Sequence, residues 1–208
     1  MDLEAFRPPL TGDSRGPSDS LSDVAVARPA LRLLFSGVMD YLPNENAVLW
    51  FTDNVWDQLQ AARPDVELII AGMNPSPAIQ NLADKPGITV TGYVEDMLAC
   101  YHDASVFVAP FQIARGVQNK ILQSFACGLP VVTTTVGAEG IDCKDGVHYA
   151  LASSPEQFVE QILRFSDDAD YSRQISANAI QLVRENYTWE AMNNVLCQLF
   201  ERSPAGRG

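Results

Sequence analysis

From residue 31 onward, short apolar runs alternate with longer segments whose apolar residues recur every three or four positions. The short runs are typical of buried strands, and the longer segments are typical of amphipathic helices. The predicted strands are LRLLFSG (31–37), VELIIAG (66–72), ITVTG (88–92), SVFVAPF (105–111), PVVTTT (130–135) and a small one near HYALA (148–152). Strands that are apolar on both sides belong to parallel sheets covered by helices on both faces. The pattern therefore predicts an α/β fold with a single Rossmann-like, doubly wound parallel sheet.

The segments between the apolar runs predict the helices. These are residues 44–63, a short helix at 76–84, residues 94–104, a helix that opens at Gly116 or Val117, and two C-terminal helices at 154–166 and 168–186, the second running on through 189–202. Gly128 is expected to cap the helix that opens near Val117, and Pro130 is expected to stop it.

Ligands of doubly wound sheets bind beyond the carboxyl ends of the strands, so the loops that follow strands are the candidate sites. Four such loops are SGVMDYLPNENA, AGMNPSP, TGYVED and APFQIARGVQNK. A glycine lies at the strand end in the first three, which permits a tight turn and a close approach of backbone to a ligand. Because glycine ends many strands, these three loops alone do not define a site.

The fourth loop opens a helix whose polar side chains suit an anion joined to a sugar. The first free amides of the helix and its dipole favour a phosphate. Side chains lean toward the N-terminus of a helix, so Lys120 can reach the same anion, and Gln123 can bond the hydroxyls of an attached sugar. This spacing suits a nucleotide diphosphate. The alternative is that Lys120 and Gln123 are solvated residues of an ordinary amphipathic helix, with Ile121, Leu122 and Phe125 on its buried side.

Composition narrows the class of protein. The 208 residues, of which 47% are hydrophobic, suffice for one globular unit. The net charge of −12 argues against a nucleic-acid-binding surface, so any anion site must be local. The four cysteines are widely spaced and form no C-x-x-C pair, which indicates reduced thiols in a cytoplasmic protein. No metal site is expected.

The two ends of the chain are not expected to belong to the folded domain. Residues 1–30 are rich in Pro, Gly, Ser and Asp and are expected to form a linker or disordered crossover segment. Residues 31–203 are expected to fold as one domain, followed by a frayed tail at 204–208. No apolar run approaches the roughly 18 residues of a membrane helix, so at most a peripheral membrane contact is expected.

Several motifs occur in a specific order and spacing. They are LLFSGVMDYLPNENAVLWF, AGMNPSPAIQNLA, ITVTGYVEDM, VFVAPFQIARGVQNKILQSFACGLPVVTT, GAEGI and YTWE. Together they resemble the donor-binding, C-terminal half of a retaining glycosyltransferase of the GT-B fold, in group 1 (family 4). They are particularly similar to bacterial sugar transferases associated with exopolysaccharide and exosortase systems. The resemblance covers residues 31–201, nearly all of the predicted domain.

The resemblance implies a nucleotide-sugar site that needs no metal or other cofactor. Lys120 would contact the diphosphate, the amides of Gly116 and Val117 would face phosphate or sugar, and Gly37 would lie beneath the diphosphate. The GYVED loop would surround the nucleobase, mostly through its backbone. The residues implied to bind the donor are Gly37, Val94, Glu95, Arg115, Gly116, Val117, Lys120 and Gln123. No catalytic residue is assigned to this chain.

Two positions depart from the family pattern. Where this chain has Gln123, relatives usually carry a glutamate that binds the ribose hydroxyls, and where it has Arg115, many carry a glutamate near the donor sugar. The motif ARGxQNK resembles the corresponding motif of the nearer relatives, so Arg115 is interpreted as a feature of that subgroup of the family. Charge-assisted hydrogen bonds of a carboxylate contribute about 1.5–3 kcal/mol, and glutamine offers a single accepting oxygen. Gln123 is therefore expected to lower donor affinity by about 10- to 100-fold relative to glutamate.

The implied function is donor binding for sugar transfer from a nucleotide-diphosphate sugar, in bacterial polysaccharide or glycoconjugate synthesis. A GT-B enzyme also has an N-terminal acceptor domain, so the chain is expected to be a cloned fragment or the product of a truncated reading frame, inactive in transfer by itself. Its terminal helix, YTWEAMNNVLCQLFER, is expected to expose an apolar face that favours self-association. Two alternatives stay open: a degenerate, non-catalytic nucleotide-binding or interaction module of the same fold, and another sugar-nucleotide enzyme such as an epimerase.

Overall fold

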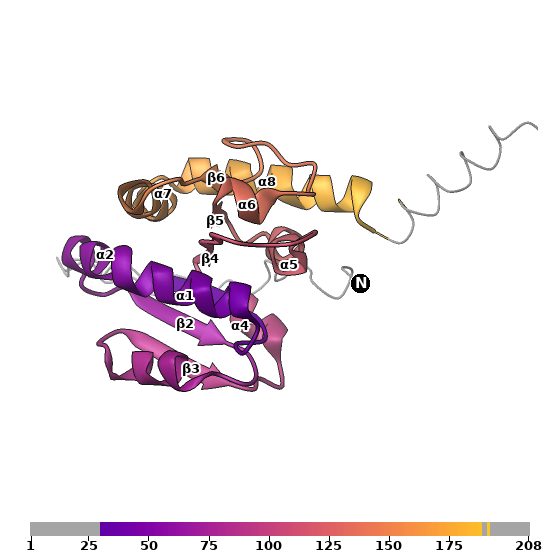
Figure 1. The fold of residues 1–208 in the computed structure, drawn as a ribbon. Helices are drawn as coiled ribbons and strands as arrows, with labels where there is room; N and C mark the ends of the chain where they lie inside the picture. Colours follow the sequence, from indigo (N-terminus) through magenta and orange to yellow (C-terminus); the bar gives the residue numbers. More distant parts are fainter. Residues whose placement is uncertain (1–29, 189–190, 192–208) are drawn as a thin grey trace, which may run out of the picture.

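Six parallel strands form one sheet within residues 30–188 and 191, the residues that this computed structural model describes (Figure 1). The strands are β1 (Arg32–Ser36), β2 (Glu67–Ala71), β3 (Ile88–Gly92), β4 (Val106–Ala109), β5 (Val131–Thr133) and β6 (Ala150–Leu151). Their order is β3-β2-β1-β4-β5-β6, and every neighbouring pair is parallel. This is the order of a Rossmann-like doubly wound sheet, which confirms the predicted fold class.

Helices connect the strands and pack on both sides of the sheet. They are α1 (Leu42–Asn54), α2 (Trp56–Ala62), α3 (Pro77–Gln80), the 3-10 helix η2 (Asn81–Asp84), α4 (Met97–Asp103), α5 (Asn119–Cys127), α6 (Thr135–Ala138), α7 (Pro155–Asp167) and α8 (Ala169–Asn186). Trp50 and Phe51 of α1 meet Phe158 of α7 at ring-centroid distances of 5.6 and 6.0 Å. Helix α5 instead contacts α4 and α8. The sheet therefore lies between two layers of helices.

The apolar character of the strands follows from this layering. All four residues of β4, VFVA, are buried, as a strand covered on both faces requires. The helices bury only one side each. On α5 the buried side includes Ile121, Leu122 and Phe125, as predicted. The opposite side of α5 therefore remains available to polar residues.

The strand order creates one position suited to a ligand. From β1 the chain crosses to β2 on one side, whereas from β4 it crosses to β5 on the other side. The loops that leave β1 and β4 therefore separate at the carboxyl ends of these two adjacent strands. Crevices at such switch points are the usual ligand sites of doubly wound sheets.

Helix α5 begins later than the sequence pattern predicted. Its first residue is Asn119, so the predicted start at Gly116 or Val117 was wrong. Gly116 has a left-handed φ of 66°, and Gln118 has extended dihedrals of −83° and 92°, so the chain cannot be helical there. The Gln118 side chain donates a hydrogen bond from Nε2 to the carbonyl oxygen of Gly116 (3.1 Å). The predicted cap was confirmed, because Gly128 ends the helix with a φ of 71°.

Two other helix predictions also need correction. The helix predicted over residues 44–63 is two helices, α1 and α2, separated at Val55. The helix predicted over 94–104 begins only at Met97, because the Asp96 carboxylate caps it by accepting a hydrogen bond from the Ala99 amide (3.1 Å). Residues 94–96 therefore belong to a loop after β3, at the same edge of the sheet as the switch point.

The last third of the chain contains one element that was not predicted. The strand expected over 130–135 ends at Thr133, and Thr134 caps the short helix α6 by accepting a hydrogen bond from the Gly137 amide (3.1 Å). Helix α8 ends at Asn186, so it does not run on without interruption. Residues 1–29 of the predicted linker, the tail at 204–208, and most of the predicted terminal helix lie outside the described residues.

Candidate functional site

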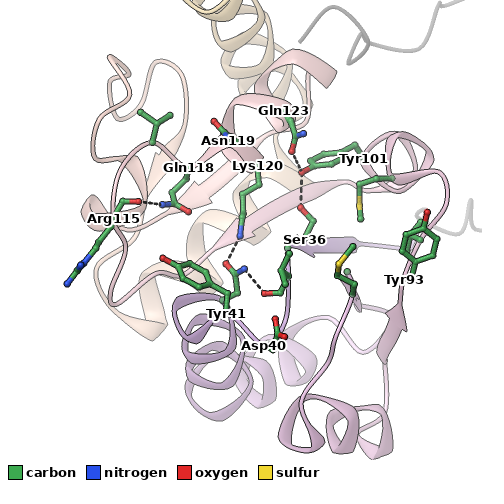
Figure 2. A pocket seen from close by; sticks show the side chains of 18 residues that line it. Ser36, Asp40, Tyr41, Tyr93, Tyr101, Arg115, Gln118, Asn119, Lys120 and Gln123 are labelled. Carbon is green, nitrogen blue, oxygen red and sulfur yellow. Dashed lines mark hydrogen bonds between the residues drawn. The ribbon is translucent and has the colours of Figure 1, made fainter. Parts of the chain in front are cut away.

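A pocket of about 890 Å³ lies beyond the carboxyl ends of β1 and β4 (Figure 2). Its walls come from the segments that follow β1, β2 and β3 and from the start of α5. The lining residues are Ser36, Gly37, Val38, Asp40, Tyr41 and Asn44 after β1; Gly72 and Met73 after β2; Tyr93, Val94, Met97 and Tyr101 after β3; and Arg115, Val117, Gln118, Asn119, Lys120 and Gln123 around α5. The volume suits a ligand of nucleotide size.

Two glycines allow the backbones after β1 and β2 to meet under the pocket. The amide of Gly37 donates a hydrogen bond to the carbonyl oxygen of Ala71 (3.0 Å). A Cβ atom on Gly72 would lie 1.6 Å from the carbonyl oxygen of Gly37, far inside van der Waals contact. Side chains are therefore excluded where these two loops cross, and the pocket floor there is bare backbone.

Three charged residues of the described part of the chain line the pocket, and Lys120 is the one that is not exposed, whereas Asp40 and Arg115 are. Nζ of Lys120 lies 5.1 Å from the ring centroids of both Phe35 and Phe111, and donates a hydrogen bond to Oδ1 of Asn44 (2.5 Å). Among the described residues no carboxylate forms an ion pair with this ammonium. Figure 2 shows the side chain reaching from α5 into the middle of the pocket. The ammonium of Lys120 is therefore not paired with a carboxylate, and the acidic residue of the wall, Asp40, is hydrogen-bonded by Asn74 instead.

Burial makes that charge costly for the free protein. Loss of hydration lowers the pKa of Lys120 to about 8. An anion that enters the pocket would replace the lost hydration and restore the preference for the charged form. The arrangement therefore favours a negatively charged ligand beside Lys120.

A chain of hydrogen bonds holds Gln123, one turn of α5 beyond Lys120, as the dashed lines in Figure 2 show. The buried Tyr101 hydroxyl donates to Oε1 of Gln123 (3.2 Å) and is bonded to the Ser36 hydroxyl (2.8 Å). Burial raises the pKa of the Tyr101 phenol, so it remains protonated and able to donate. The bond to Tyr101 fixes the Gln123 carboxamide with its oxygen toward the phenol.

The corrected start of α5 changes which backbone amides can serve an anion. Among the described residues no hydrogen bond is made to the amides of Asn119 and Lys120, whereas the Ile121 amide already bonds the Gln118 carbonyl (2.9 Å). The free amides at the positive end of the helix dipole are therefore those of Asn119 and Lys120. Gly116 and Val117 lie in the loop before the helix, so the expectation that their amides face phosphate or sugar stays a prediction.

The structure brings most of the predicted donor-binding residues to one pocket. Those on its wall are Gly37, Val94, Arg115, Val117, Lys120 and Gln123. Arg115 lies at the rim, and its side chain points away from Lys120 (Figure 2). Glu95 and Gly116 are exposed and do not belong to the wall. Tyr93 is 71% exposed and stands at the rim opposite Arg115.

Sequence reasoning missed three residues that organise the site. Asn44 binds Lys120, and Ser36 and Tyr101 hold Gln123. The only local signal was the position of Ser36 and Asn44 in the first loop that follows a strand. Nothing in the sequence indicated that the hydroxyl of Tyr101, in the middle of a helix, would turn into the same pocket.

Two other features, a cluster of metal ligands and a membrane-spanning helix, are absent from the described residues. No group of three or more His, Cys, Asp or Glu side chains in that part of the chain is arranged to hold a metal ion. None of the helices described there combines the length and the apolar composition needed to cross a membrane.

With its parallel sheet of order β3-β2-β1-β4-β5-β6 and a pocket at the switch point, the domain has the architecture of the doubly wound α/β class. The family model for glycosyl transferases group 1 matches residues 30–168, and the chain belongs to that family. Among curated relatives, a Klebsiella pneumoniae protein of the cps region is 25% identical over 164 residues, which are 74% of this chain and 42% of that protein. A probable sucrose-phosphate synthase of Thermosipho melanesiensis is 30% identical over 82 residues, 39% of this chain and 19% of that protein. The chain thus spans less than half the length of these relatives.

Solved structures show the same fold at low sequence identity. The C-terminal domain of LpcC, a group 1 glycosyl transferase from Francisella tularensis, superposes with a TM-score of 0.66 at 16% identity, covering 91% of this chain and 99% of that domain. Anabaena HepE in complex with UDP-glucose gives a TM-score of 0.69 at 14% identity, over 97% of this chain and 55% of that protein. The match to an isolated C-terminal domain agrees with the predicted half of a GT-B fold.

Proposed function

We propose that this chain is the donor-binding domain of a glycosyltransferase, and that a nucleotide-diphosphate sugar binds in the pocket at the switch point. The observation that supports this most is the buried ammonium of Lys120, which no carboxylate neutralises within the described residues. A diphosphate between Lys120 and the free amides of Asn119 and Lys120 would receive charge-assisted hydrogen bonds from both.

The same proposal gives the remaining parts of the donor a place in the pocket. Ribose hydroxyls would meet the amide of Gln123, and the nucleobase would lie toward Tyr93 and Val94 at the edge of the pocket. Bare backbone at Gly37 would leave room beneath the diphosphate. The relative HepE is solved with UDP-glucose, which supports a nucleoside diphosphate sugar as the ligand class.

During transfer the diphosphate is the leaving group, and negative charge develops on it as the glycosidic bond breaks. Lys120 and the helix amides would stabilise that charge without further movement. The acceptor and the groups that act on it are proposed to come from a second lobe, a proposal supported by the greater length of the relatives that this chain matches only in part. Five apolar side chains at the pocket mouth are 42–71% exposed, which supports a partner surface there; they are Val38, Tyr41, Met73, Tyr93 and Val117.

The cellular setting is part of this proposal. Kinship with a cps-region protein supports a role in bacterial polysaccharide or glycoconjugate synthesis. The free thiols of Cys100, Cys127 and Cys143 suit a reducing cytoplasm, where nucleotide sugars are used. Self-association was predicted from the terminal helix, which lies mostly outside the described residues.

Calorimetric titration of the full chain with UDP, GDP and their sugars tests the proposed function. Saturable binding of at least one nucleotide diphosphate, with the matching nucleoside monophosphate bound more weakly, is the expected result. No binding of any of these compounds at millimolar concentration would instead support the alternative, a degenerate module that retains the fold without the ligand.

Replacing Gln123 with glutamate is expected to raise UDP affinity by about 10- to 100-fold. A carboxylate would accept a charge-assisted bond from a ribose hydroxyl while Tyr101 continues to donate to its other oxygen. Calorimetry with UDP and with 2′-deoxy-UDP measures the gain and the share that depends on the 2′-hydroxyl.

The matched control is Gln118→Glu, which introduces the same carboxylate on the same pocket wall. Gln118 bonds its own loop through the Gly116 carbonyl, so this variant is expected to leave UDP binding unchanged or weaker. Unchanged or weaker binding of UDP by Gln123→Glu would contradict the placement of the ribose at residue 123.

A further inference from the structure

The contact between Asn44 and Lys120 joins two helices across the pocket. Asn44 is the third residue of α1 and is only 4% exposed, and Lys120 is the second residue of α5. Oδ1 of Asn44 accepts a hydrogen bond from Nζ of Lys120 (2.5 Å), while Nδ2 donates to the carbonyl oxygen of Val38 (2.9 Å). An ammonium can only donate and a carbonyl can only accept, so these two bonds fix the orientation of the Asn44 amide.

The backbone of Gly37 leaves space for this contact. A Cβ atom at Gly37 would lie 2.6 Å from Nδ2 of Asn44 and 2.8 Å from Nζ of Lys120. The loop after β1 therefore contributes the bare backbone at Gly37 and the carbonyl that anchors Asn44, and the first turn of α1 contributes the Asn44 amide. Asn44 holds Nζ of Lys120 directly, Val38 fixes Asn44, and Gly37 leaves the space that both side chains occupy.

The groups around Nζ hold it without cancelling its charge. They are an amide oxygen and the faces of Phe35 and Phe111, all of them neutral. An ammonium has three N–H donors, and Asn44 uses one of them. An aspartate has nearly the shape of an asparagine, but in this buried place it would form an ion pair with Lys120 and neutralise it. The neutral amide leaves both charge and donors for a ligand.

From this arrangement we propose that Asn44 is the positioning residue of Lys120 and sets the specificity of the pocket for anionic diphosphates, because its neutral carboxamide fixes the ammonium and leaves its charge uncompensated. The inference deepens the proposed function and rests on it for the identity of the ligand. Asn44 acts through Lys120 and need not touch the donor itself.

Asn44 has two proposed effects: it positions Lys120, and it leaves the charge of Lys120 uncompensated. The variant Asn44→Asp retains the first effect and removes the second. UDP affinity, measured by calorimetry on the full chain, is expected to fall by at least about 30-fold, although Lys120 keeps an acceptor. The matched control Asn54→Asp makes the same change at the exposed end of α1 and is expected to alter UDP affinity by less than about twofold. UDP affinity of Asn44→Asp within about threefold of the wild type would overturn the inference.

A second variant keeps the inference testable if Asn44→Asp fails to fold. Asn44→Ala removes the anchor without adding charge, and a loss of about 5- to 20-fold in UDP affinity is expected. That loss must disappear when Lys120 is also alanine, because Asn44 acts through Lys120. An equal loss in both backgrounds would show that Asn44 only supports the local structure, and would overturn the inference.

A ligand-free readout separates this inference from the proposed function. If the wild-type chain binds no UDP, the proposed function fails, and NMR titration of the Lys120 ammonium then decides the role of Asn44. Asn44→Asp must raise the pKa of Lys120 by at least about one unit, because a buried counter-charge favours the protonated form. The same pKa in Asn44→Asp and wild type would show that residue 44 does not control the ammonium.

Discussion

Replacing Lys120 with alanine is expected to lower UDP affinity by at least about 100-fold. The variant removes the only ammonium that the described part of the chain places on the pocket wall, while a diphosphate would still lose its hydration on entering. Calorimetry at constant ionic strength measures the loss. Folding is not expected to suffer, because the wild-type protein buries this charge against a neutral amide without a counter-charge.

The matched control for that variant is Lys144→Ala, which removes the same charge from an exposed position away from the pocket wall. UDP affinity of this control is expected to stay within about twofold of the wild-type value. Binding of UDP by Lys120→Ala at nearly the wild-type affinity would contradict the assignment of the diphosphate to α5.

Replacing Gly72 with alanine is expected to lower the free energy of unfolding by about 3 kcal/mol or more, or to prevent folding. The new Cβ would lie 1.6 Å from the carbonyl oxygen of Gly37, and the φ of Gly72, +150°, disfavours any side chain. The clash can be relieved only if the loops after β1 and β2 separate. That movement would also disturb the pocket floor. Urea unfolding followed by circular dichroism measures the change.

Gly92→Ala provides a comparison at the end of the neighbouring strand. Gly92 has a φ of +67°, but a Cβ there would have open space around it, so only the backbone strain of about 1 kcal/mol is expected. The comparison isolates the steric effect of the crossing loops. A loss of stability in Gly72→Ala no larger than that in Gly92→Ala would show that the two backbones are farther apart than the structure indicates.

The layered fold could be predicted because the pattern of apolar residues depends on it directly. A strand such as VFVA, apolar at every position, has no stable place except between two layers of helices. The start of α5 could not be predicted in the same way. Apolar periodicity does not report that Gly116 adopts a left-handed φ or that Gln118 stays extended, since both depend on local backbone choices in a loop.

The candidate site could be predicted only in part for a related reason. Lys120 and Gln123 follow from the position of one helix after one strand, which is local information. Their partners are distant in sequence: Asn44 lies 76 residues from Lys120, and Tyr101 lies 22 residues from Gln123. Whether a polar side chain is buried against a particular partner depends on how the helices pack across the sheet. That packing cannot be read from the local pattern of a single sequence.

Titration of the Lys120 ammonium by NMR, with and without saturating UDP, tests the central claim most directly. In the free protein burial lowers the pKa of Lys120 to about 8, so the protonated form that binds a diphosphate is lost as the pH rises past that value. A bound diphosphate favours protonation, so UDP is expected to raise this pKa by at least about one unit. An unchanged pKa of Lys120 in a chain saturated with UDP would place the diphosphate elsewhere and contradict the account.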